Sequence, residues 1–140
     1  MTDTPATGLT RFKRPLLYLM APIYVVAGLF HFLNPKPFVA IVPEELPSPL
    51  GLVYLSGLAE IVLGVGLLSP RTRQLSAKGL VLLLAAVFPA NVDMAVRGQG
   101  TEGLPDHPAV DAALWLRLPL QGVLMAWAWW YSTPLPDESA

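Results

Sequence analysis

The sequence predicts an all-α integral membrane protein, a transmembrane four-helix bundle. Of its 140 residues, 54% are hydrophobic and only 14% are charged, whereas soluble domains carry about 25% charged residues. Four apolar segments follow one another, at 15–33, 51–69, 78–96 and 112–132. Each is close to the roughly 20 residues that cross a bilayer core of about 30 Å. Four helices that are apolar all round leave too little polar surface for a soluble fold of this length.

The first segment, 15–33, follows three basic residues, as the apolar part of a signal peptide also does. Its length, and the lack of a small-x-small cleavage site after it, favour a retained span. We therefore expect one membrane domain at 15–132. The flanking segments, 1–14 and 133–140, are expected to be disordered cytoplasmic tails.

The connections between the spans differ in character. The first, "NPKPFVAIVPEELPSP", contains five prolines and so cannot form one regular helix. Its "FVAIV" run suits a short interfacial or re-entrant segment over the bundle. The second, "SPRTRQLS", is short, which makes the second and third spans antiparallel neighbours. The third, "RGQGTEGLPDHPAVD", is expected to be polar and flexible.

The orientation follows from the basic residues, since loops rich in Lys and Arg stay in the cytoplasm. The side that holds both termini would carry most of them: Arg11, Lys13, Arg14, Arg71, Arg73 and Lys78. The opposite side has only Lys36 and Arg97. Both termini are therefore expected in the cytoplasm.

Glu60 is the one charged residue of the apolar run "GLAEIVLGVGLL". It lies about 13 Å along the second span from its outer end, close to mid-membrane. Gly57 and Gly64 share its helical face by the three-and-four rule. Because small residues mark close helix contacts in membranes, Glu60 is expected to point into the bundle.

The other spans place polar groups in the same outer half of the bundle, namely His31, Asn91, Arg117 and Gln121. The inner half is expected to hold almost none. A charge at mid-membrane is costly, so Glu60 would either pair with Arg117 or be protonated. Asp93 and Arg97 are four apart and are expected to pair near the outer surface.

Three interpretations of this polar cluster remain open. Buried polar residues often hold membrane helices together without any chemistry. They can also line a pocket for a ligand or cofactor, in which case the candidate ligand-binding residues are His31, Glu60, Asn91, Arg117 and Gln121. Proton or ion transport ranks third, because four spans usually need oligomerisation to form a pathway.

The composition excludes several classes of site. The chain has no cysteine, so disulfides, thiol relays and cysteine metal sites are ruled out. Two histidines, His31 and His107, make a poor haem or metal signature, and no metal or haem is predicted. A net charge of −1 gives no electrostatic support for nucleic-acid binding.

Four motifs, in order and at these spacings, resemble the DoxX-like family of small four-span bacterial membrane proteins: "GLFHFLNP", "GLAEIVLGVGLLSP", "FPANVDMAV" and "LRLPLQGVLMAWAWW". The resemblance covers 15–132 and carries the five polar positions named above. It implies a four-helix bundle in the bacterial inner membrane. Some members of that family are subunits linked to quinone-dependent sulfur oxidation or redox-stress complexes, and a distant branch assists receptor assembly.

Two functional hypotheses follow. In the first, the protein is a redox-associated accessory subunit whose polar cluster binds a quinone or another lipophilic small molecule. Electron transfer would then require a partner redox enzyme, and thiol chemistry would require a partner with cysteines. In the second, the protein is a non-enzymatic assembly factor for other membrane proteins, and the cluster is structural. The sequence leaves open whether the chain forms a homo-oligomer and whether it has any catalytic activity.

Overall fold

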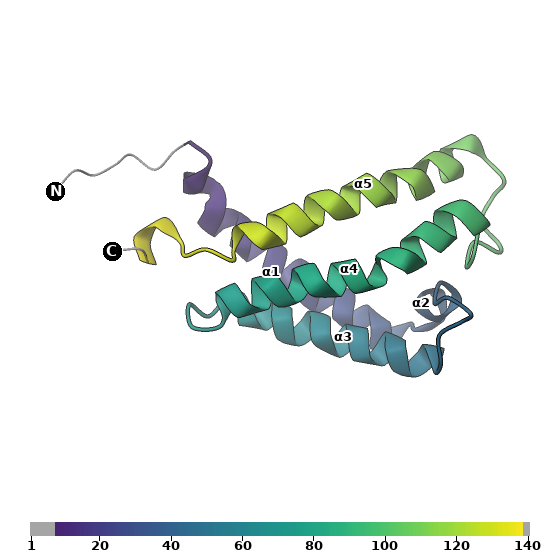
Figure 1. Cartoon of the computed structure of the whole chain (residues 1–140), viewed down its shortest axis with the longest axis horizontal. Coiled ribbons are helices and arrows are strands. Elements are labelled where there is room, and N and C mark those ends of the chain that lie inside the picture. Colours follow the sequence, from purple (N-terminus) through teal and green to yellow (C-terminus); the bar gives the residue numbers. More distant parts are fainter. Residues whose placement is uncertain (1–7, 139–140) are drawn as a thin grey trace.

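The computed structural model describes residues 8–138, and in this range the protein is all-helical (Figure 1). A short 3-10 helix at Thr10–Phe12 leads into α1 (Lys13–Leu33). The remaining α-helices are α2 (Lys36–Ala40), α3 (Pro49–Gly66), α4 (Arg73–Arg97) and α5 (Pro108–Trp130). A second 3-10 helix, Pro136–Glu138, ends the described chain.

Four of these helical segments are long and apolar enough to cross a membrane. They are Thr10–Leu33, Pro49–Gly66, Arg73–Arg97 and Pro108–Trp130, which agrees with the predicted spans within a few residues at each end. Large apolar side chains are exposed on every one of them, and such surfaces are stable when lipid covers them. The prediction of a multi-pass, four-helix membrane protein is confirmed.

The bundle has two distinct ends (Figure 1). At one, which we call the terminal end, α1 begins, α3 turns into α4, and α5 is followed by the C-terminal segment. At the other, the loop end, lie α2 and the connection between α4 and α5. Helix α3 packs mainly against α1, α4 packs mainly against α5, and the contact between α3 and α4 joins the two pairs. The α3–α4 turn confirms that these spans are antiparallel neighbours.

Glycines allow α1 and α3 to approach closely. A Cβ atom at Gly28 would lie 2.5 Å from the Gly57 carbonyl oxygen, and one at Gly57 would lie 2.9 Å from the Gly28 carbonyl oxygen. Neither position can hold a larger residue without a backbone shift. This contact brings the polar side chains one turn away on each helix next to each other.

Most of the buried core lies towards the terminal end. Its fully buried side chains come from α1, α4, α5, the start of the α3–α4 turn and the C-terminal segment: Leu17, Met20, Ala21, Leu67, Ala77, Leu80, Ala128, Tyr131 and Leu135. Polar side chains that flank the predicted spans are buried at this end as well. They include Lys13, Arg73 and Ser76.

The prediction of a disordered tail at 133–140 is wrong for Thr133 to Glu138. Leu135 is fully buried, and Lys13 Nζ donates to the carbonyl oxygens of Thr133 and Pro134 at 3.1 and 3.0 Å. Arg73 Nη1 donates to both oxygens of the Glu138 carboxylate at 2.6 Å. These contacts fix the segment, because it satisfies two cations that the bundle would otherwise bury unpaired. The last two residues, 139–140, lie outside the described range.

The predicted N-terminal tail, 1–14, is also partly helical. Residues 10–12 form the 3-10 helix, and α1 begins at Lys13. Residues 1–7 lie outside the described range. The Tyr131 hydroxyl donates to the Lys13 carbonyl oxygen at 2.9 Å, which ties the residue after α5 to the start of α1.

The two loop-end connections contact each other. In the α1–α3 connection, the apolar run 38–42 begins within α2, which is a short helix over the bundle. Gln99 Nε2, in the α4–α5 connection, donates to the Val42 carbonyl oxygen just after α2. Gly100, at φ 76°, lies so close to Ala40 and Ile41 that a Cβ would meet backbone atoms at 3.0 Å. The start of the α4–α5 connection is therefore held against α2 instead of extending freely.

Candidate functional site

The five predicted site residues form two clusters instead of one. His31 and Glu60 meet between α1 and α3, whereas Asn91, Arg117 and Gln121 meet between α4 and α5. Among residues 8–138, no hydrogen bond or ion pair joins the clusters. The expected pairing of Glu60 with Arg117 is wrong: Glu60 pairs with His31, because the glycine contact places α3 on α1.

The first cluster is built around the contact between His31 and Glu60. Glu60 Oε2 lies 3.2 Å from His31 Nδ1, and the same nitrogen lies 2.8 Å from the Ala27 carbonyl oxygen. A carbonyl only accepts hydrogen bonds, so Nδ1 carries a hydrogen and donates it to Ala27. Phe38 of α2 stacks on the imidazole, with ring centroids 3.9 Å apart and planes inclined by 22°. Helix α2 thus covers the histidine.

Two buried oxygens of this cluster lack a hydrogen bond. Within the described range, the Tyr24 hydroxyl and Glu60 Oε2 are inaccessible and have no hydrogen-bond partner. Tyr24 is only 6% exposed, and the Glu60 carboxyl is close enough to act on it electrostatically. Because nearly all buried polar groups in proteins are hydrogen-bonded, each exception requires an explanation. Together the two oxygens form an unsatisfied polar patch at the α1–α3 contact.

Tyr24 and Phe38 were not among the predicted site residues. The three-and-four spacing already put Tyr24 on the helical face of Gly28 and His31, so a signal was present. The contact of Phe38 could not be anticipated in the same way, because it depends on how the proline-rich connection folds back over α1.

Hydrogen bonds within the second cluster satisfy its amide groups. Asn91 Nδ2 donates to Gln121 Oε1, and Gln121 Nε2 donates to the Leu84 carbonyl oxygen. Gln121 is buried, and Arg117 Nη2 donates to Asn91 Oδ1 at 3.1 Å. Asn91 and Gln121 therefore behave as a structural link between α4 and α5, while Arg117 remains exposed on the helix surface.

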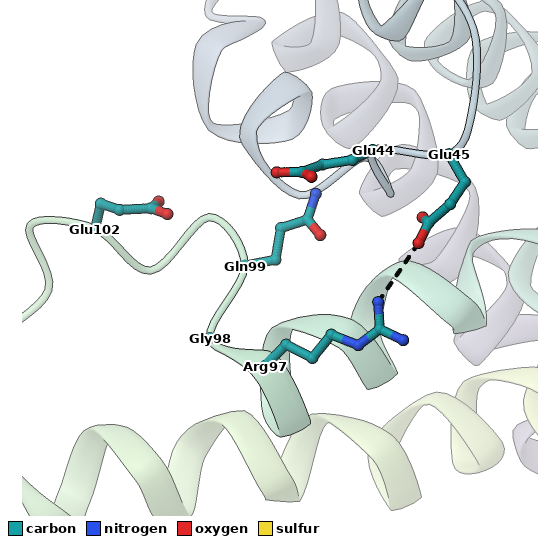
Figure 2. A pocket seen from close by; sticks show the side chains of 6 residues that line it. All are labelled: Glu44, Glu45, Arg97, Gly98, Gln99 and Glu102. Atoms are coloured by element: carbon teal, nitrogen blue, oxygen red, sulfur yellow. Dashed lines mark ion pairs between the residues drawn. The ribbon is translucent and has the colours of Figure 1, made fainter.

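A polar pocket of about 250 Å³ lies at the loop end, between the two connections (Figure 2). Figure 2 shows Glu44, Gln99 and Glu102 around it, with the ion pair from Arg97 to Glu45 at one side. This pair spans 3.6 Å, and Arg97 Nε lies 3.5 Å from Asp93 Oδ1. The predicted pairing of Asp93 with Arg97 is confirmed.

No group of three or more His, Asp or Glu side chains in the described chain is arranged to hold a metal ion. His107 lies away from His31 in sequence and fold: it caps α5, with its Nδ1 accepting from the Ala109 N–H at 3.0 Å.

Comparison with known proteins gives one family. No curated protein and no solved structure matched the chain. A family model described as a domain of unknown function, DUF8561, matches residues 20–132. The match includes most of α1, all of α2 to α5, and both polar clusters. The chain belongs to the DUF8561 family.

Proposed function

We propose that the protein binds the polar head of a quinone or a similar lipophilic small molecule at Tyr24, His31 and Glu60. The observation that carries this proposal is the pair of buried oxygens without hydrogen-bond partners, on Tyr24 and Glu60. A ligand with carbonyl or hydroxyl groups would supply the missing partners. The tyrosine hydroxyl can donate to a carbonyl or accept from a hydroxyl, and a carboxylate accepts from a hydroxyl.

The surroundings of the cluster support a ligand of this kind. The apolar walls of α1 and α3 suit an isoprenoid or alkyl tail, and a few polar groups among apolar walls are typical of small-molecule sites. Phe38 lies on His31, so α2 would have to move for a ring to reach the histidine. Glu60 and His31 are 3.2 Å apart and could exchange a proton with the ligand.

In this proposal the protein is a DoxX-like accessory subunit of a redox system, and a partner enzyme carries the electrons. Its location is the bacterial inner membrane, with the terminal end in the cytoplasm. The distribution of basic residues supports that orientation: Arg11, Arg71 and Lys78 are exposed near the terminal end, whereas Glu44, Glu45 and Glu102 are exposed at the loop end.

The test is mass spectrometry of small molecules extracted from the detergent-purified wild type and from Glu60→Gln. We expect a stoichiometric lipophilic compound in the wild type. The substitution replaces the carboxyl with a neutral amide and should weaken the affinity by about tenfold or more, so that less of the compound is recovered. Glu45→Gln, which changes an exposed carboxylate at the loop end, is the matched control and should retain the compound.

The second candidate function is that of a membrane assembly factor, and the α4–α5 cluster favours it. The amides of Asn91 and Gln121 are bonded within the protein, as expected of residues that only hold helices together. If the wild type carries no compound and Glu60→Gln only unfolds at a lower temperature, the α1–α3 cluster is structural as well. That outcome would replace the ligand proposal with this one.

A further inference from the structure

Arg117 is a cation within a membrane-spanning helix that has no anionic partner among residues 8–138. It takes part in none of the ion pairs of this range, and its guanidinium donates to the neutral side chain of Asn91. By contrast, Arg73 pairs with Glu138, and Arg97 pairs with Glu45 and Asp93. A charge in a membrane helix is costly unless it meets an anion or reaches the interface.

The position of Arg117 directs its guanidinium towards the loop end. Side chains in an α-helix tilt towards the helix N-terminus, and α5 begins at the loop end (Figure 1). Its hydrogen-bond partner Asn91 lies six residues before the end of α4, or about 9 Å along the helix. A long arginine side chain at this depth reaches towards the lipid headgroups.

An apolar groove of about 340 Å³ lies on the same pair of helices as Arg117 and Asn91. Its lining residues come from α4 and α5: Ala85, Phe88, Leu118, Gly122 and Met125. Leu118 directly follows Arg117, and Phe88 is one turn from Asn91. From Leu118 to Met125 the groove extends about 10 Å towards the terminal end.

Gly122 keeps this groove open. A Cβ added there would meet no atom within 4 Å, whereas at Gly28, Gly57 and Gly64 it would meet a neighbouring helix at 2.5 to 3.1 Å. The glycines of α1 and α3 thus serve helix packing inside the chain. The glycine of α5 leaves a space instead.

We propose that Arg117 and this groove form a binding site for an acyl-chain lipid with an anionic headgroup. The headgroup anion accepts hydrogen bonds from the guanidinium, and Asn91 holds the guanidinium in place. One acyl chain lies in the groove against Phe88 and Gly122. The direction from the cation to the groove matches a lipid of the loop-end leaflet. The cation lies nearer the loop end, and the groove leads towards the bilayer centre. The site is separate from the α1–α3 cluster and independent of the proposed function.

The test compares two lipids with the same chains, dioleoyl phosphatidylglycerol and dioleoyl phosphatidylcholine, titrated onto the purified protein and followed by native mass spectrometry. We expect one anionic lipid to bind about tenfold or more tightly than the zwitterionic one, because the phosphate charge of phosphatidylglycerol is not offset by a cation, whereas the choline ammonium repels the guanidinium. Arg117→Gln should abolish this preference, and Arg117→Lys, which keeps the charge, should retain most of it. Gly122→Leu should weaken the binding of both lipids by filling the groove.

Two matched controls separate the site from general effects. Arg71→Gln removes an exposed cation at the terminal end, and Val123→Leu adds bulk at an exposed position outside the groove. Both should bind like the wild type. The proposal is overturned if the wild type does not distinguish the two lipids or if Arg71→Gln acts like Arg117→Gln. Equal competition by glycerophosphoglycerol without chains would also overturn it, as would a lipid-independent dimer that Gly122→Leu disrupts.

Discussion

At the scale of single residues, Gly57 determines the partner of Glu60. Because Gly57 has no side chain, α3 approaches α1 until the Gly57 backbone lies against the Cβ and ring of His31. Glu60, one turn further along α3, then reaches the imidazole and not a cation on α5. The contact between Glu60 and His31 is therefore a consequence of backbone contact between two helices.

Gly57→Ala is expected to destabilise the protein. The added Cβ would lie 2.6 Å from the His31 Cβ and 2.9 Å from the Gly28 carbonyl oxygen, and neither atom is the end of a flexible side chain. Such overpacking costs about 1–3 kcal/mol. Unfolding in detergent, followed by circular dichroism, measures the change. Gly122→Ala is the control, because nothing lies within 4 Å of its Cβ; an equal loss in both variants would contradict the argument.

The polar residues of the site could be identified from the sequence, but not their partners. Spacing along one helix placed Glu60 with Gly57 and Gly64, and this grouping agrees with the structure. Pairing across helices depends on which spans touch. Spacing along a single helix carries no such information, so five residues at a similar depth were assigned to one site.

At the scale of elements, the C-terminal segment closes the terminal end. Arg73, whose side chain is 4% exposed, donates to Leu67 and to both oxygens of Glu138. The hydrogen bonds from Arg73 lower the pKa of Glu138 from its usual value of 4.5. The desolvation of the neighbouring Tyr131 phenol raises its pKa, in keeping with a closed end. The four spans were predictable from hydropathy, but this segment was not, because its own composition is polar and its partners lie in other elements.

The stability supplied by Glu138 should depend on pH. A carboxyl whose folded pKa is lowered stabilises the fold fully above its unfolded value and loses this contribution as the pH falls through the folded value. The melting temperature of the wild type should therefore exceed that of Glu138→Gln by a constant margin above pH 4.5. The margin should shrink at lower pH. Thermal melts in detergent from pH 3 to 8, a range set about the usual carboxyl pKa, would measure it.

The control for this titration is Glu102→Gln. Glu102 is exposed at the loop end and has no ion pair among the residues described. The melting temperature of the Glu102→Gln variant should follow that of the wild type at every pH. A margin for Glu138→Gln that stays constant down to pH 3, well below the usual carboxyl pKa, would contradict the assigned contact.

At the scale of the whole molecule, the two ends differ in charge. Near the terminal end the described cations are Arg11, Lys13, Arg14, Arg71, Arg73 and Lys78, and the described acids are Asp137 and Glu138. Near the loop end, acidic residues outnumber Lys36 and Arg97. This asymmetry was readable from the sequence, because it requires only the order of spans and loops.

The orientation can be tested directly because the natural chain has no cysteine. Single cysteines introduced by Arg71→Cys and Glu102→Cys lie at exposed positions of opposite ends. In intact cells, a maleimide that does not cross the inner membrane should label Glu102→Cys and leave Arg71→Cys unlabelled. Both should react after the membrane is permeabilised, and the reverse pattern in intact cells would place the termini outside.

The contacts of Lys13 have a consequence for biosynthesis. Its ammonium group and backbone carbonyl are bound by residues 131–134, about 120 positions later in the chain. A ribosome releases α1 well before this segment. The first span must therefore enter the bilayer with a hydrated lysine at its end, and the bundle is sealed there only after residues 131–134 have emerged. A chain truncated before Tyr131 would insert its spans and leave Lys13 without these partners.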